Sequence, residues 1–109
     1  MMHVIDIIRQ EIMSNPVLIF MKGSPKQPKC PYSRNAVNAL NSTNVPFSYV
    51  DISQNLEIQQ ALPKVADWPT FPQIFIDGEL IGGGDTVVEL NEAGSLKLMM
   101  EFAINKAAD

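Results

Sequence analysis

The sequence predicts an α/β fold in which helices cover both faces of a four-stranded mixed sheet. Two strand-like runs, Val17–Met21 and residues 47–52, are joined through a helical segment, which is typical of a right-handed parallel crossover. Two further runs, residues 72–76 and Glu79–Gly82, flank Asp77-Gly78, which favours an antiparallel hairpin. With 109 residues, 46% apolar and 18% charged, the chain fits a single domain over residues 1–109.

The first half of the chain alternates helical and strand-like segments. Apolar residues recur at helical spacing over residues 3–14, and Asn15-Pro16 ends that helix. The next five residues, Val17–Met21, are all apolar and rich in strand formers, which predicts a buried strand. Glycine and proline make residues 22–29 a loop. A helix then begins at Cys30-Pro31, because proline is favoured at the first helical position, and it ends in the asparagine-rich stretch that follows.

The second half adds a strand, a helix, the hairpin and a helical end. Residues 47–52 alternate and predict the second strand. The apolar spacing from Leu56 to Val65 predicts a helix in which Pro63 is a kink or an early stop. Gly83-Gly84-Asp85 predicts a turn into a helix with Asp85 as its N-cap. A last helix holds Leu96, Leu98, Met99, Phe102 and Ile104. The order helix, strand, helix, strand, helix, hairpin, helix is that of the thioredoxin fold.

The composition excludes several classes of protein. A net charge of −4 supplies no broad positive face for nucleic acid. The longest uninterrupted apolar run, Val17–Met21, is far too short to span a bilayer, and the N-terminal residues show no signal-peptide pattern. A single cysteine cannot form an internal disulfide, so we expect a protein of the reducing cytoplasm.

Cys30 is the only cysteine, and it lies where a predicted helix begins. The unpaired N–H groups and partial positive charge of a helix N-terminus stabilise a thiolate, which is both a nucleophile and a metal ligand. Half of the lysines and arginines surround it in a stretch without carboxylates: Lys22, Lys26, Lys29 and Arg34. A solvated loop with chance lysines also explains these charges, and a lone cysteine is often buried and inert. The polar, turn-forming flanks Lys29 and Pro31 favour exposure.

Four other features bear on function, and two of them leave alternatives open. Ser33 stands where a dithiol motif has its second cysteine, so redox turnover requires an external thiol. Trp68-Pro69-Thr70-Phe71-Pro72 predicts a plain proline-rich turn or, with a cis bond before Pro72, a strand-like edge for a peptide ligand. Gly82-Gly83-Gly84-Asp85 predicts a turn and cap, or an amide nest whose carboxylate receives an ammonium group. The single histidine, His3, is interpreted as a surface residue, which excludes a metal site built on histidines.

Together these segments resemble the single-domain, cluster-binding monothiol glutaredoxins, almost from end to end. Three motifs carry the resemblance: Met21-Lys22-Gly23-Ser24-Pro25 with its long loop to Cys30, Trp68-Pro69-Thr70-Phe71-Pro72-Gln73, and Asp77-Gly78-Glu79-Leu80-Ile81-Gly82-Gly83. The resemblance implies a protein of iron–sulfur cluster biogenesis and transfer, with Cys30 as catalytic residue and metal ligand. Two subunits would share one 2Fe–2S cluster, held by Cys30 of each and by the thiols of two glutathiones. Its implied partners are BolA-type proteins and cluster-recipient apoproteins.

The resemblance also implies how glutathione is bound. Lys22 would meet a glutathione carboxylate, and Phe71 would present backbone groups to the cysteinyl part. Gly84 and Asp85 would receive the γ-glutamyl end, with Asp85 facing its ammonium. Gln59 stands where the family usually has an arginine that binds the glycine carboxylate of glutathione. Glutamine keeps a hydrogen-bond donor there but lacks the positive charge of arginine.

Two departures from the family pattern bear on function. Cys30-Pro31-Tyr32-Ser33 replaces the usual Cys-Gly-Phe-Ser and is closer to the disulfide-reducing glutaredoxins, which tend to be better reductases and poorer cluster carriers. Gly84 replaces a second cysteine that relatives often carry. The leading expectation is a cluster carrier. The alternatives are a glutathione-dependent monothiol reductase of glutathionylated protein thiols, and a catalytically silent interaction module.

Overall fold

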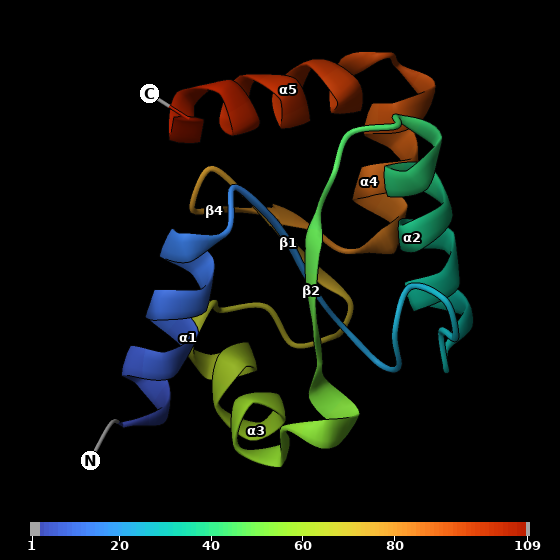
Figure 1. Ribbon diagram of the computed structural model, residues 1–109. Helices are drawn as coiled ribbons and strands as arrows, with labels where there is room; N and C mark the ends of the chain where they lie inside the picture. Colours follow the sequence, from blue (N-terminus) through green and yellow to red (C-terminus); the bar gives the residue numbers. More distant parts are fainter. Residues whose placement is uncertain (1–2, 109) are drawn as a thin grey trace.

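The computed structural model describes residues 3–108 and places a four-stranded sheet between two layers of helices (Figure 1). In chain order the elements are α1 (Val4–Ser14), β1 (Val17–Met21), α2 (Pro31–Ser42), β2 (Ser48–Asp51), the 3₁₀ helix η1 (Ile52–Gln54), α3 (Leu56–Val65), β3 (Gln73–Ile76), β4 (Glu79–Gly82), α4 (Gly84–Glu92) and α5 (Ser95–Ala108). Helices α1 and α3 cover one face of the sheet, and α2, α4 and α5 cover the other. The predicted thioredoxin fold is confirmed.

The sheet has the strand order β2-β1-β3-β4. Strand β1 runs parallel to β2 and antiparallel to β3, and β3 runs antiparallel to β4. The register pairs Met21 with Asp51 and Phe20 with Gln73. The ends of β1 and β2 and the beginning of β3 therefore lie together at one end of the sheet.

Strand β1 is buried along its whole length and divides its side chains between two cores. Leu18 and Phe20 face α1 and α3, where the ring of Phe20 packs edge-on against Phe75 with 5.7 Å between ring centroids. The second core, under α2, α4 and α5, takes the odd-numbered residues of the strand: Val17, Ile19 and Met21. Because both faces are covered, the strand is uniformly apolar, as predicted. The hairpin prediction is also confirmed, since Asp77 and Gly78 connect β3 to β4 and have φ values of 53° and 79°.

An early stop at Pro63 is wrong, because α3 continues to Val65. Pro63 cannot donate a backbone hydrogen bond, but the carbonyl groups of the last turn still accept hydrogen bonds. The N–H of Ala66 donates to Leu62 at 2.8 Å, and the N–H of Trp68 donates to Pro63 at 3.0 Å.

The segment after the hairpin contains two helices. The sequence predicts a helix that follows Asp85 and a last helix that holds Leu96 and Ile104, although the order of elements counts them as one; the structure has α4 and α5 on either side of Gly94, whose φ of 78° interrupts the helical path. Asp85 is not the N-cap of α4, since the helix begins at Gly84 and its cap is Gly83, two residues before Asp85. None of the helices within residues 3–108 has the length and apolar character needed to cross a membrane.

Two strands are shorter than predicted, the second at both ends and the third at its start. The second strand is Ser48–Asp51 rather than residues 47–52, because the Asp51 carboxylate accepts from the Ser53 N–H at 2.9 Å and turns the chain into η1. The third begins at Gln73 rather than at Pro72, which lacks an N–H for the ladder.

Candidate functional site

A groove of about 860 Å³ opens at the end of the sheet where β1 stops. It lies between the first turn of α2, helix α3, the segment before β3 and the first turn of α4. Its lining residues are Lys22, Cys30, Tyr32, Gln59, Pro63, Trp68, Pro69, Thr70, Phe71, Pro72, Gly83, Gly84, Asp85 and Thr86. The groove thus brings together all six residues predicted for the site, although their roles toward a ligand stay predictions.

Cys30 is the N-cap of α2 and is partly exposed on the rim of the groove, which rules out the buried, inert alternative. Pro31 follows it in the first turn, as predicted. Burial raises the pKa of the Cys30 thiol, but several other effects outweigh it. Hydrogen bonds from the backbone N–H groups of Ser33 and Tyr32, the charge of Lys22 and the Ser33 hydroxyl together hold the pKa below its ordinary value of 9.0. The helix N-terminus therefore stabilises the thiolate.

Ser33 has a role beyond replacing a second cysteine. Its side chain is fully buried, and its hydroxyl oxygen accepts the backbone N–H of Lys22 at 3.3 Å. The Ser33 hydroxyl is also among the groups that lower the pKa of the Cys30 thiol. Ser33 therefore ties the end of β1 to the first turn of α2. The sequence offers no local signal for this link.

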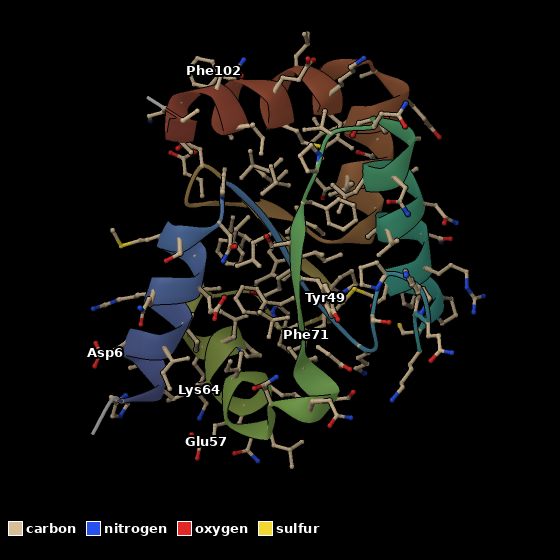
Figure 2. The ribbon with its side chains drawn as sticks, viewed as in Figure 1. Asp6, Tyr49, Glu57, Lys64, Phe71 and Phe102 are labelled. Carbon is tan, nitrogen blue, oxygen red and sulfur yellow. The ribbon has the colours of Figure 1, made fainter. Side chains whose placement is uncertain are left out.

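The segment Trp68–Pro72 forms one wall of the groove, and the Phe71–Pro72 peptide bond is cis. Phe71, labelled in Figure 2, is half-buried there. The fully buried side chain of Gln73 supports this wall from behind, because its amide Nε2 donates to the carbonyl groups of Trp68 at 2.9 Å and Thr70 at 3.3 Å. The proline-rich stretch is therefore a fixed wall rather than a plain surface turn.

The opposite wall is the first turn of α4. Gly84 is buried so close to α2 that a Cβ atom built on it would lie 2.9 Å from the carbonyl oxygen of Tyr32. Asp85 is exposed and lines the groove as the second residue of the helix. Gln59 of α3 is half-buried and completes the lining, next to Pro63. The groove therefore carries a cation at Lys22 and a carboxylate at Asp85.

The loop before Cys30 is tied to the sheet by a residue that the sequence did not single out. One carboxylate oxygen of Asp51, at the end of β2, accepts the N–H of Gly23 at 2.9 Å. Burial raises the pKa of the Asp51 carboxyl, but hydrogen bonds from Ser53 and Gly23 and the charge of Lys29 hold it below its ordinary value of 3.8. Lys29, which the sequence places beside Cys30, thus acts on Asp51.

Metal-binding groups are sparse in the described part of the chain. Within residues 3–108 no three side chains of histidine, cysteine, aspartate or glutamate come together as a metal site. His3 is exposed and caps α1, with its Nδ1 accepting the N–H of Ile5 at 3.2 Å. Cys30 is the only cysteine of the sequence and could therefore supply one thiolate ligand to a metal.

The lowered pKa predicts that Cys30 alkylates as a thiolate over a wider pH range than an ordinary thiol does. The rate constant with iodoacetamide, plotted against pH, should have its midpoint below 9.0. The rate falls on the acid side of that midpoint, because protonation removes the nucleophile. Cys30 is the only cysteine, so loss of free thiol reports it directly. The denatured chain should titrate near the ordinary value, and a folded midpoint equal to the denatured one would contradict the prediction.

Comparisons with known proteins agree with this geometry. Residues 17–81 match the family model described as Glutaredoxin. A Haemophilus ducreyi protein described as Glutaredoxin 4 is 49% identical over 105 residues, which cover 96% of this chain and 98% of the relative. Glutaredoxin 4 of Escherichia coli K12 is 50% identical over 97 residues, covering 89% and 84%.

Two solved structures superimpose on most of this chain. Reduced poplar apo GrxS14 superimposes with a TM-score of 0.78 at 39% identity and covers 93% of both chains. A buckwheat glutaredoxin–glutathione complex superimposes with a TM-score of 0.77 at 27% identity, covering 88% of this chain and 86% of its own.

Proposed function

This chain belongs to the glutaredoxin family, and we propose that it binds glutathione in the groove and shares a 2Fe–2S cluster with a second copy of itself. It is a monothiol member, because Cys30 is its only cysteine. The observation that carries the proposal is a stabilised thiolate on the rim of a groove, with no second thiol in the chain. Such a sulfur needs an external thiol for either redox turnover or cluster binding.

The charged side chains of the groove complement the charged groups of glutathione. Glutathione is a tripeptide with two carboxylates, one ammonium group and a thiol. Lys22 complements a carboxylate, Asp85 complements the ammonium, and both lie on the same groove as Cys30. The Phe71 segment, held by Gln73, supplies an extended edge for the cysteinyl part. Gln59 offers an amide donor toward the glycine carboxylate.

The donor set fits a cluster that is carried as cargo rather than kept as a resident cofactor. A 2Fe–2S cluster takes four thiolates, and this chain offers one. Two copies and two glutathione thiols complete the set, with each Cys30 ionised by its helix and by Lys22. A partly exposed ligand favours release to a recipient. We therefore propose a role in cytoplasmic iron–sulfur cluster biogenesis, with BolA-type proteins and recipient apoproteins as partners.

Anaerobic reconstitution tests this proposal. The full chain, supplied with ferrous iron, sulfide and glutathione, should develop visible absorption and migrate as a dimer. Native mass spectrometry should then find two chains, one cluster and two glutathiones. Omission of glutathione should prevent all of this. A colourless monomer in the presence of all components would contradict the proposal.

A second candidate function is the reduction of glutathionylated protein thiols. Pro31, in place of the family's usual glycine, favours it. In this reaction the Cys30 thiolate attacks the glutathionyl sulfur, the protein thiolate leaves, and Cys30 becomes glutathionylated. A glutathione thiolate then attacks the glutathionyl sulfur on Cys30, which releases oxidised glutathione and restores the Cys30 thiolate. Steady turnover of a glutathionylated substrate by a preparation that binds no cluster would favour this function over the first.

A further inference from the structure

We propose that the pocket beside the edge strand β2 (the β2 pocket) is a docking site for an extended, acidic segment of a partner protein. The pocket measures about 740 Å³ and lies between the tip of the loop of residues 22–29, the end of α2 and the start of β2. It shares no lining residue with the groove that holds Cys30. A segment bound here leaves that groove open, so the proposal depends neither on glutathione nor on a cluster.

Strand β2 offers an open edge beside this pocket. It is the first strand in the order β2-β1-β3-β4, so its backbone N–H and C=O groups pair with β1 on one side only. An unpaired edge can accept a further extended segment, which adds to the sheet through main-chain hydrogen bonds. Because β2 comprises only Ser48–Asp51, it matches a short segment.

The side of the β2 pocket that faces the sheet is apolar. In the register Tyr49 pairs with Ile19, which belongs to the core under α2, so both side chains point to the α2 face of the sheet. Tyr49, labelled in Figure 2, is 48% exposed. Phe47 packs against the same core, and Pro25 and Pro46 extend the apolar lining. A large apolar side chain of an added segment can pack against this surface.

The charge of the β2 pocket favours an acidic partner. Among residues 3–108, Lys26 is the only charged residue that lines it. The Lys26 side chain is exposed, and the one ion pair of the described chain joins Lys106 to Asp77 instead. No aspartate or glutamate occurs in the sequence between Glu11 and Asp51. A chain with a net charge of −4 thus presents a cation here, and a carboxylate of the partner complements it.

The loop that carries Lys26 is held in place by hydrogen bonds. At its tip, Ser24 and Gln27 exchange backbone hydrogen bonds of 3.2 and 3.0 Å. Asp51, at the end of β2, does not line the pocket, and its carboxylate accepts the Gly23 N–H at 2.9 Å. This contact ties the loop to the strand. Because the site is formed before a partner binds, little free energy is spent on ordering it.

These features define the partner segment. Side chains two positions apart in an extended chain point to the same face of a sheet. A segment with a large apolar residue over Phe47 and Tyr49 can therefore direct an aspartate or glutamate two positions away toward Lys26. A helical segment cannot pair with the edge of β2, and a basic segment is repelled by Lys26. The pocket thus fits a strand-forming segment in which an acidic and an apolar residue are separated by one residue.

Nuclear magnetic resonance of the full, isotope-labelled chain tests the proposal with a heptapeptide that is blocked at both ends, Thr-Glu-Thr-Phe-Thr-Glu-Thr. Its phenylalanine has a glutamate two positions away on either side, so the peptide can pair with β2 in either direction. We expect it to shift the amide signals of residues 47–51 and of Lys26 in a saturable manner. The same peptide with lysine in place of both glutamates should leave these signals unchanged.

Two variants of the chain test the contacts, and a third is the matched control. Lys26→Glu should weaken the peptide affinity about fivefold or more, because it replaces an exposed attraction by a repulsion of similar size. Tyr49→Ser should also weaken it, because the apolar lining is reduced. Lys97→Glu changes the net charge equally on α5, where the side chain is exposed and lines neither the pocket nor the groove. Its affinity should stay within about twofold of the unsubstituted chain.

Three outcomes would overturn the proposal. The first is an absence of shifts at β2 with the peptide at millimolar concentration. The second is a set of shifts confined to the groove, at Phe71 and Gly84. The third is an equal loss of affinity in Lys97→Glu and Lys26→Glu, since net charge alone would then attract the peptide. The spread of the amide signals shows directly that each variant is folded.

Discussion

Replacement of Cys30 by serine is expected to abolish both cluster assembly and turnover of glutathionylated substrates. A serine hydroxyl stays protonated at neutral pH, so it neither ligates iron as a thiolate does nor attacks a disulfide. Serine is a favourable N-cap, and Cys30 caps α2, so the fold should persist. The visible spectrum after anaerobic reconstitution and the steady-state rate with a glutathionylated protein measure the two losses.

The control for Cys30→Ser restores a thiol at another place. Ser24 lies in the same loop and is half-buried, so adding Ser24→Cys to Cys30→Ser returns a cysteine away from the start of α2. This double variant should stay inactive in both assays, because the helix N-terminus and Lys22 stabilise a sulfur only at position 30. Visible absorption of the single variant after reconstitution would show that Cys30 is not a cluster ligand.

Most of the fold follows from local patterns in the sequence. Strand β1 is predicted to the residue, because a strand covered on both faces has no polar position. The start of α2 follows from Pro31, and the hairpin follows from Asp77-Gly78, since both depend on backbone geometry that few residues adopt. The break between α4 and α5 can be predicted from local geometry in the same way, because glycine commonly ends helices and Gly94 lies between the two.

The contacts that shape the site are harder to predict, because they join residues far apart in the chain. Asp51 and Gly23 are 28 residues apart, and Ser33 and Lys22 are 11 apart. Asp51-Ile52-Ser53 does carry a local signal, an aspartate that caps its own turn. Its second partner, Gly23, becomes evident only when the register places β2 beside the end of β1. Local patterns singled out Cys30, the Trp68–Pro72 segment and Gly82–Asp85, whereas Gln59 and the roles toward glutathione came from the resemblance.

Gln73→Met is expected to weaken glutathione binding more than its effect on stability explains. Methionine keeps much of the side-chain volume but removes both donors to the Trp68 and Thr70 carbonyls. The Gln73 Oε1 atom is buried without a hydrogen-bond partner among residues 3–108, so its removal offsets part of the loss. We expect the free energy of unfolding to fall by about 1–2 kcal/mol. The affinity for glutathione, measured by calorimetry, should fall by about fivefold or more, because ordering a loosened wall costs free energy on binding.

A loosened wall and a merely less stable protein would both weaken glutathione binding, so the two must be separated. Leu96→Ala supplies that separation, because Leu96 is fully buried in the core under α5 and does not line the groove. Its cavity should cost about 2–5 kcal/mol, at least as much as Gln73→Met. At a temperature where both variants are folded, Leu96→Ala should bind glutathione as the unsubstituted chain does. If Leu96→Ala weakens binding as much as Gln73→Met, stability alone governs the groove. If only Gln73→Met does so, the buried amide holds the ligand-facing wall in place before glutathione arrives.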